Sequence, residues 1–307
     1  MSPNLAVWIA VTFAIALAGL PVLAASKDKD RQKALQKYAT KVGLPLTADV
    51  HGRVVARLQG FERASLVGAI VGAAAGVPAL IGLSALSGRS WENETALVIM
   101  SAVALGAVFG PAVTAVRQTL QPHTDRRVAR ATTPEIADYV PLLERLSGPL
   151  SVAVSLIAVV GGAWLFSSGQ FNSGEFSAQA LLLSPGAILS YLAVVTLIGG
   201  IVASRLVLQA GQGAETEHEL AWDDALRAMT LRRLAVLPFV VATIGCWTLA
   251  VQLPTVVDDP TPVQAVVGST ALLGFTVVVI IASVINATRA PARHFLRRLW
   301  QREEQAA

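Results

Sequence analysis

The sequence predicts an all-α membrane protein, a polytopic bundle of seven transmembrane helices with its N-terminus outside and its C-terminus in the cytoplasm. Hydrophobic residues make up 54% of the 307 residues and charged residues only 14%, whereas soluble domains carry about 25% charged residues. Several apolar runs reach the ~20 residues that are needed to cross a hydrocarbon layer of ~30 Å. Basic residues collect on one side of these runs, as the positive-inside rule requires.

The seven predicted spans form one N-terminal helix and three helical hairpins. Inside lipid the backbone must pair its own polar groups, so each span is expected to be helical. The hairpins occupy residues 57–117, 140–205 and 227–289, in one membrane domain that extends over residues 1–307. The individual spans are 5–25, 64–86, 95–116, 148–166, 181–203, 234–253 and 265–285.

The first apolar run, residues 5–25, could also be a cleaved signal peptide. A signal peptide, however, carries basic residues before its apolar core. Residues 1–4 contain none, and a basic cluster begins at Lys27. Because positive charge stays in the cytoplasm, we expect a retained helix whose N-terminus lies outside.

The distribution of charge fixes the expected orientation of the other spans. Every basic residue except Arg89 falls on the predicted cytoplasmic side. These residues stand at span ends without interleaved aromatic residues for base stacking, so no nucleic-acid partner is predicted. They suit the anionic headgroups of a lipid bilayer. The acidic residues expected outside are Glu92, Glu94, Glu175, Asp258 and Asp259.

The three hairpins resemble one another at their ends, because each opens on a charged pair and closes on an arginine. Duplication of one unit would produce this pattern. The positive-inside rule acting on any series of hairpins would produce it as well, and both explanations remain open. The opening pairs are Glu62-Arg63, Glu144-Arg145 and Arg232-Arg233, and the closing residues are Arg117, Arg205 and Arg289.

Glycines recur every four residues in both helices of the first hairpin. Gly68, Gly72 and Gly76 would share one face of the first helix, and Gly106 and Gly110 one face of the second. Small residues at this spacing let two helix backbones approach closely in lipid. We therefore expect these faces to be helix contacts, although glycine is also simply common in membrane helices.

Two juxtamembrane segments are candidates for contact with a partner protein or with the lipid surface. Residues 220–227 would form a helix with Trp222 on one face and charges on the other, either a docking helix or a helix anchored at the membrane by its tryptophan. Residues 290–307 form a basic amphipathic cytoplasmic tail. The candidate contact residues are Trp222, Asp223, Asp224, Arg227, Arg293, Arg297 and Trp300.

No catalytic, cofactor-binding or metal-binding residue is predicted. The predicted spans contain no ionisable acid or base, which argues against ion-coupled transport. One cysteine, Cys246, excludes a disulfide framework and a cysteine-based metal site. No two histidines have the i, i+4 spacing that puts two ligands on one helix face; they are His51, His123, His218 and His294.

At residues 220–227, with the basic stretch and the apolar span that follow, the chain resembles uncharacterised multi-pass membrane proteins of GC-rich actinobacteria. The resemblance implies a bacterial plasma membrane and no particular activity. The leading hypothesis is a non-enzymatic subunit or accessory of a membrane complex, working with a cytoplasmic or membrane protein partner. The alternatives are a small permease for an apolar or lipid-like solute and a membrane enzyme that acts on lipid.

Overall fold

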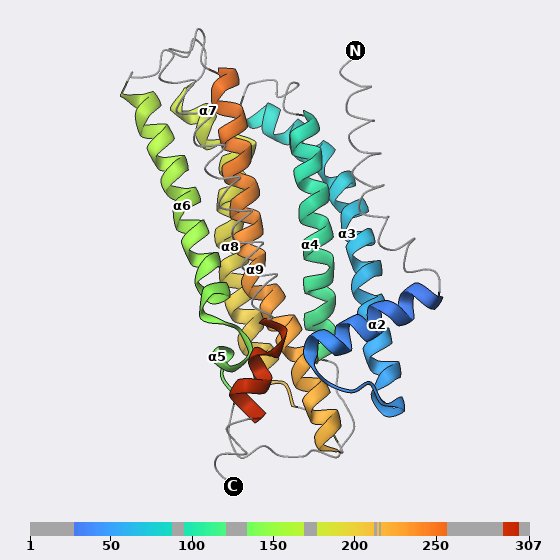
Figure 1. Ribbon diagram of the computed structural model, residues 1–307. Helices are drawn as coiled ribbons and strands as arrows, with labels where there is room; N and C mark the ends of the chain where they lie inside the picture. Colours follow the sequence, from blue (N-terminus) through green and yellow to red (C-terminus); the bar gives the residue numbers. More distant parts are fainter. Residues whose placement is uncertain are drawn as a thin grey trace.

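The computed structural model describes residues 28–87, 95–120, 134–168, 177–211, 214, 216–256 and 291–300. Within these residues the chain forms helices and turns and no strand (Figure 1). The helices are α2 (Asp28–Val42), α3 (Ala48–Ser87), α4 (Thr95–Leu120), α5 (Ile136–Tyr139), α6 (Leu142–Ser167), α7 (Ala178–Leu182), α8 (Pro185–Gln209) and α9 (Glu217–Val256), followed by a 3₁₀ turn η1 (Pro291–Arg293) and a π turn η2 (Leu296–Trp300).

Five described helices, α3, α4, α6, α8 and α9, are long and apolar enough to cross a membrane. Four of them contain a predicted span in full, and α8 contains the predicted span 181–203 from residue 185 onward, because Leu183 and Ser184 separate it from the short helix α7. The helical prediction is confirmed for these five. The predicted spans 5–25 and 265–285 lie outside the described residues. The described part of the chain is therefore an all-helical bundle with the composition of a multi-pass membrane protein.

Two of the long helices extend well beyond a bilayer. α3 and α9 contain 40 residues each, which corresponds to a length of about 60 Å at 1.5 Å per residue. The helix predicted at residues 220–227 is therefore continuous with the span that follows, and so are residues 48–63, which precede the first span of the first hairpin. The second hairpin differs, because Pro141 lacks an N–H and disfavours the helical conformation at Val140, which is extended. As a result α5 is separated from α6.

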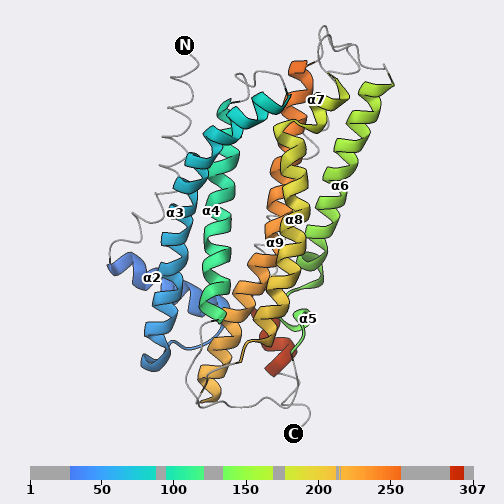
Figure 2. The ribbon, with the colours of Figure 1, turned by 180° about the vertical axis from the view of Figure 1, so that it is seen from behind.

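The two hairpins whose limbs are both described pack differently. α3 and α4 contact each other along their length, whereas α6 and α8 each contact α9 more extensively than they contact each other. Figures 1 and 2 show α3 and α4 as one pair and α6, α8 and α9 as a second group beside it. The two views also show α3 bent in its final third, the part that contains Pro78.

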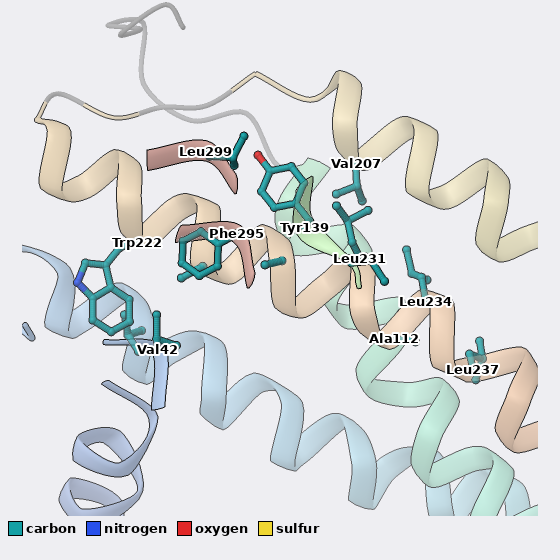
Figure 3. Packing of buried hydrophobic residues seen from close by; sticks show 14 of the residues in the cluster. Val42, Ala112, Tyr139, Val207, Trp222, Leu231, Leu234, Leu237, Phe295 and Leu299 are labelled. Atoms are coloured by element: carbon teal, nitrogen blue, oxygen red, sulfur yellow. The ribbon is translucent and has the colours of Figure 1, made fainter. Parts of the chain in front are cut away.

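The largest hydrophobic core of the described residues extends along α4, α6, α8 and α9 and reaches one end of the bundle, where α2, α5 and η2 join it. We call this end the basic end: the end at which α3, α6 and α9 begin, together with α2, α5, η1 and η2. The bulkiest fully buried side chains of the described residues, Trp222, Tyr139 and Phe295, belong to it. Figure 3 shows Trp222, Phe295 and Val42 gathered together, with Tyr139 and Leu299 nearby. Segments far apart in sequence therefore meet at this end.

Candidate functional site

The start of α9 is the point at which the basic end is assembled. Trp222 is only 2% exposed, and its Nε1 donates a hydrogen bond to the carbonyl oxygen of Pro45 at 3.0 Å. Its ring lies 6.3 Å from the ring of Tyr38 on α2. Burial at this position raises the pKa of Tyr38 to about 12. Trp222 thereby fixes α2 and the α2–α3 connection against α9.

The neighbouring carboxylate of Asp224 fixes two further segments. Asp224 is fully buried and accepts hydrogen bonds from the Tyr139 hydroxyl at 2.9 Å and from Nε1 of Trp300 at 3.3 Å. Tyr139 belongs to α5 and Trp300 to η2. A buried carboxylate needs such donors, because an unpaired charge is costly in an apolar core. Asp224 therefore joins α5 and the C-terminal turns to α9.

The C-terminal turns pack into the protein through their apolar side. Phe295 and Leu299 are buried in the core of the basic end, while Arg297 is exposed. Nη2 and Nε of Arg293 donate to the carbonyl oxygens of Thr40 at 2.8 Å and Lys41 at 3.3 Å. These are carbonyl groups of the last turn of α2, where a cation is favoured.

Three predicted contact residues are not at the surface, which corrects the expectation for them. Trp222, Asp224 and Arg227 are 2%, 0% and 4% exposed. Arg227 uses Nη2 and Nη1 to donate to the carbonyl oxygens of Ala210 at 2.7 Å and Leu208 at 3.5 Å, after and within α8. A helix considered alone could not show that other segments cover it. Asp223 and Trp300 are half-buried, and Arg293 and Arg297 are exposed.

Arg57 joins three helices at the basic end. It is 9% exposed, and its Nη2 donates to the carbonyl oxygen of Ala115 at 2.9 Å, to Oγ1 of Thr230 at 2.8 Å and to Oγ1 of Thr119. The sequence gave no indication of this role. The long side chain reaches across to α4 and α9, and all three acceptors are neutral.

A second pair of contacts lies one turn further along α3, around Phe61. The guanidinium carbon of Arg233 lies 4.0 Å from the centre of the Phe61 ring, and that of Arg57 lies 5.4 Å from it. Cations are attracted to an aromatic face at such distances. Phe61, which is 3% exposed, thus holds cationic side chains from α3 and α9 beside the apolar core.

Glu144 and Arg232 form a bidentate ion pair between α6 and α9. Nε of Arg232 donates to Oε2 at 2.7 Å, and Nη2 donates to Oε1 at 2.6 Å. The sequence had put these residues at equivalent positions of the second and third hairpins. The sequence did not indicate that these two residues bind each other. Their opposite charges at equivalent span ends were the one feature that could have suggested it.

The five glycines of the first hairpin lie in the contact between α3 and α4. A Cβ built at Gly68 would overlap the carbonyl oxygen of Gly106, and one at Gly72 would overlap that of Ala102. A Cβ at Gly110 would overlap the carbonyl oxygen of Ala64. At Gly76 a Cβ would lie 3.1 Å from the Cβ of Ala102. The two glycine faces therefore approach to backbone contact.

Histidines, acids and the cysteine of the described residues do not gather into any group of three that could hold a metal ion. His51 is exposed and His218 is half-buried. Nε2 of His294 lies 3.0 Å from the carbonyl oxygen of Ala137. His123 lies outside the described residues. No protein family, curated protein or solved structure matches the chain.

Proposed function

We propose that the chain is a seven-helix protein of a bacterial plasma membrane that works as a non-enzymatic subunit or accessory of a membrane complex. Its N-terminus lies outside and its basic end lies in the cytoplasm. The apolar side chains that cover the outward faces of the long helices support the membrane location, for example Val67 at 59% exposed, Ile81 at 65% and Val195 at 64%. In water such surfaces would be unfavourable, whereas lipid solvates them.

The orientation follows from the arginines of the basic end and is tested by thiol labelling. In a Cys246→Ser background, single cysteines at Gly174 and Asp259 should react with a membrane-impermeant maleimide in intact cells. A cysteine at Gly213 should react only after the membrane is opened, because positive charge stays in the cytoplasm. Labelling of the Gly213 position in sealed cells would contradict the orientation.

The outward face of α6 is the observation that carries the subunit proposal. Its exposed apolar residues lie three or four residues apart, with one adjacent pair, and so form one broad face of the helix. Gly161 lies on this helix with no atom within 4 Å of a Cβ built on it, and a hollow of about 550 Å³ opens beside it. This open space beside a glycine leaves room for a side chain of a neighbouring helix. The face comprises Leu142, Leu143, Leu146, Leu150, Val154, Ile157, Val160 and Trp164, between 46% and 71% exposed.

A photo-cross-linking residue at Ile157 tests whether a second helix occupies this face. Val195, on α8 and similarly exposed, is the matched control position. We expect a discrete cross-linked species with another polypeptide from position 157 and none from position 195, together with a stoichiometric partner after purification in mild detergent. Cross-links only to lipid, or only within the chain itself, with a monodisperse lone protein, would contradict the subunit proposal.

One pocket favours the permease for a lipid-like solute as a second candidate. It has a volume of about 540 Å³ between the α3–α4 pair and α9, with Val108, Pro111 and Leu237 in its apolar lining and Arg232 and Arg233 also facing it. An acyl chain beside a basic group is the arrangement found at anionic-lipid sites between membrane helices. Mass spectrometry of the purified protein separates the candidates: a retained stoichiometric lipid without a protein partner favours the permease.

A further inference from the structure

A cavity at the basic end is lined by three arginines from α3 and α9. Its volume is about 260 Å³, and its polar lining residues are Arg53, Arg57, Gln118, Thr119, Asp223 and Arg227. Arg53 is paired with Glu219 at 2.8 Å. Among the described residues neither Arg57 nor Arg227 forms an ion pair with a carboxylate, and their acceptors are carbonyl and hydroxyl oxygens. The Asp223 carboxylate, which also lines the cavity, interacts with Arg57 electrostatically without a direct ion pair. Within this part of the chain two buried cations therefore have no directly paired anion.

Three polar atoms of these lining residues are buried without a hydrogen-bond partner. They are Nε of Arg57, Nε of Arg227 and Oε1 of Gln118. The two arginines are 9% and 4% exposed, so bulk water does not satisfy them. Buried donors in proteins are almost always paired, and an exception calls for an explanation. Two unpaired guanidinium N–H groups beside one cavity are donors for an oxyanion, which arginine binds with favourable geometry.

The position of the cavity favours a ligand from the aqueous side. Each of the two arginines lies about two helical turns, about 10 Å, before a predicted span. Arg57 precedes the span 64–86, and Arg227 precedes the span 234–253. The cavity therefore lies beyond the apolar layer on the side of the basic end. The carboxylate of Asp223 also lines the cavity and repels an anion, so the arginines supply the attraction of the cavity for an anion.

We propose that this cavity binds a phosphate group, from a soluble phosphate or phosphomonoester or from a lipid headgroup, between Arg57 and Arg227. The guanidinium groups of the two arginines donate to its oxygens. The Gln118 amide offers a third donor when its NH₂ end is turned toward the cavity. The proposal stands independently of the subunit and permease hypotheses.

The test uses the full chain in nanodiscs of zwitterionic lipid and measures its melting temperature at constant ionic strength. Inorganic phosphate, with chloride as the control anion, is titrated in one arm. In the second arm part of the lipid is replaced by phosphatidylglycerol. A saturable rise with free phosphate identifies a soluble ligand, and a rise only with phosphatidylglycerol identifies a headgroup. No rise in either arm means that the cavity holds only water, which overturns the proposal.

Variants tie any response to this cavity. Arg57→Lys and Arg227→Lys keep the charge and remove the guanidinium donors, so the apparent affinity for the responding phosphate source should fall about tenfold. Asp223→Asn removes the opposing carboxylate and should raise the affinity about threefold or more. Arg205→Lys makes the same change at an exposed arginine of α8 and is the matched control. Equal affinities in Arg57→Lys, Arg227→Lys and Arg205→Lys, with each variant folded, would overturn the assignment.

Discussion

Replacing Gly72 by leucine is expected to destabilise the protein by about 3 kcal/mol or more, because the added side chain forces two helix backbones apart. A Cβ at this position already overlaps the carbonyl oxygen of Ala102 and lies 3.2 Å from the Cα of Val103. These are backbone atoms, which cannot rotate away as a flexible side chain can. The measurement is the thermal unfolding of the purified protein in detergent.

Two controls separate this clash from the general effect of bulk. Ala74→Leu adds similar volume two positions along α3, where the side chain is exposed. Gly82→Leu makes the same chemical change on the same helix, with no atom within 4 Å of the new Cβ. Both variants should melt within a few degrees of the native protein. Equal losses in all three variants would remove the glycine contact from the account of how α3 and α4 pair.

The local pattern of apolar and small residues was sufficient to predict the long helices and the glycine faces on them. Apolar runs uninterrupted by charge identified the five long helices now described, because lipid forces such segments to be helical. The glycine faces were visible for the same reason: residues four apart share a helix face whatever surrounds them. The residues at which one helix ends and the next begins were harder to predict. The helix predicted at 220–227 and the residues from 48 onward continue into the spans that follow them, whereas Pro141 separates α5 from α6.

Contacts between distant segments were not accessible from the sequence. Trp222 was expected to dock a partner or to anchor its helix at the membrane, and Asp224 was expected on the charged face of the same helix. In the structure Pro45, Tyr139 and Trp300 supply the partners of their polar atoms, and these residues come from three other parts of the chain. Burial of these polar side chains depends on the whole bundle, which no local spacing encodes.

The ion pair between Glu144 and Arg232 leads to the second large effect. Glu144→Ala should destabilise the protein by about 3 kcal/mol, because removing one member of a shielded pair leaves the other charge without its partner. The side chains are 10% and 19% exposed, and two short hydrogen bonds hold them in register. The bond also joins α6 to α9, which is the main neighbour of α6. Reversible unfolding by denaturant in mixed micelles measures the loss.

The ion pair between Arg53 on α3 and Glu219 on α9 provides the comparison, because it also involves α9. Its side chains are 40% and 18% exposed, and Nη2 of Arg53 lies 2.8 Å from Oε1 of Glu219. Exposed pairs contribute little, so Glu219→Ala should cost less than about 1 kcal/mol. In a double-mutant cycle the loss from Glu144→Ala with Arg232→Ala should be clearly smaller than the sum of the two single losses, since the second change removes the charge that the first left unpaired. Strict additivity, or equal losses for Glu144→Ala and Glu219→Ala, would show that the shielded pair does not hold α6 against α9.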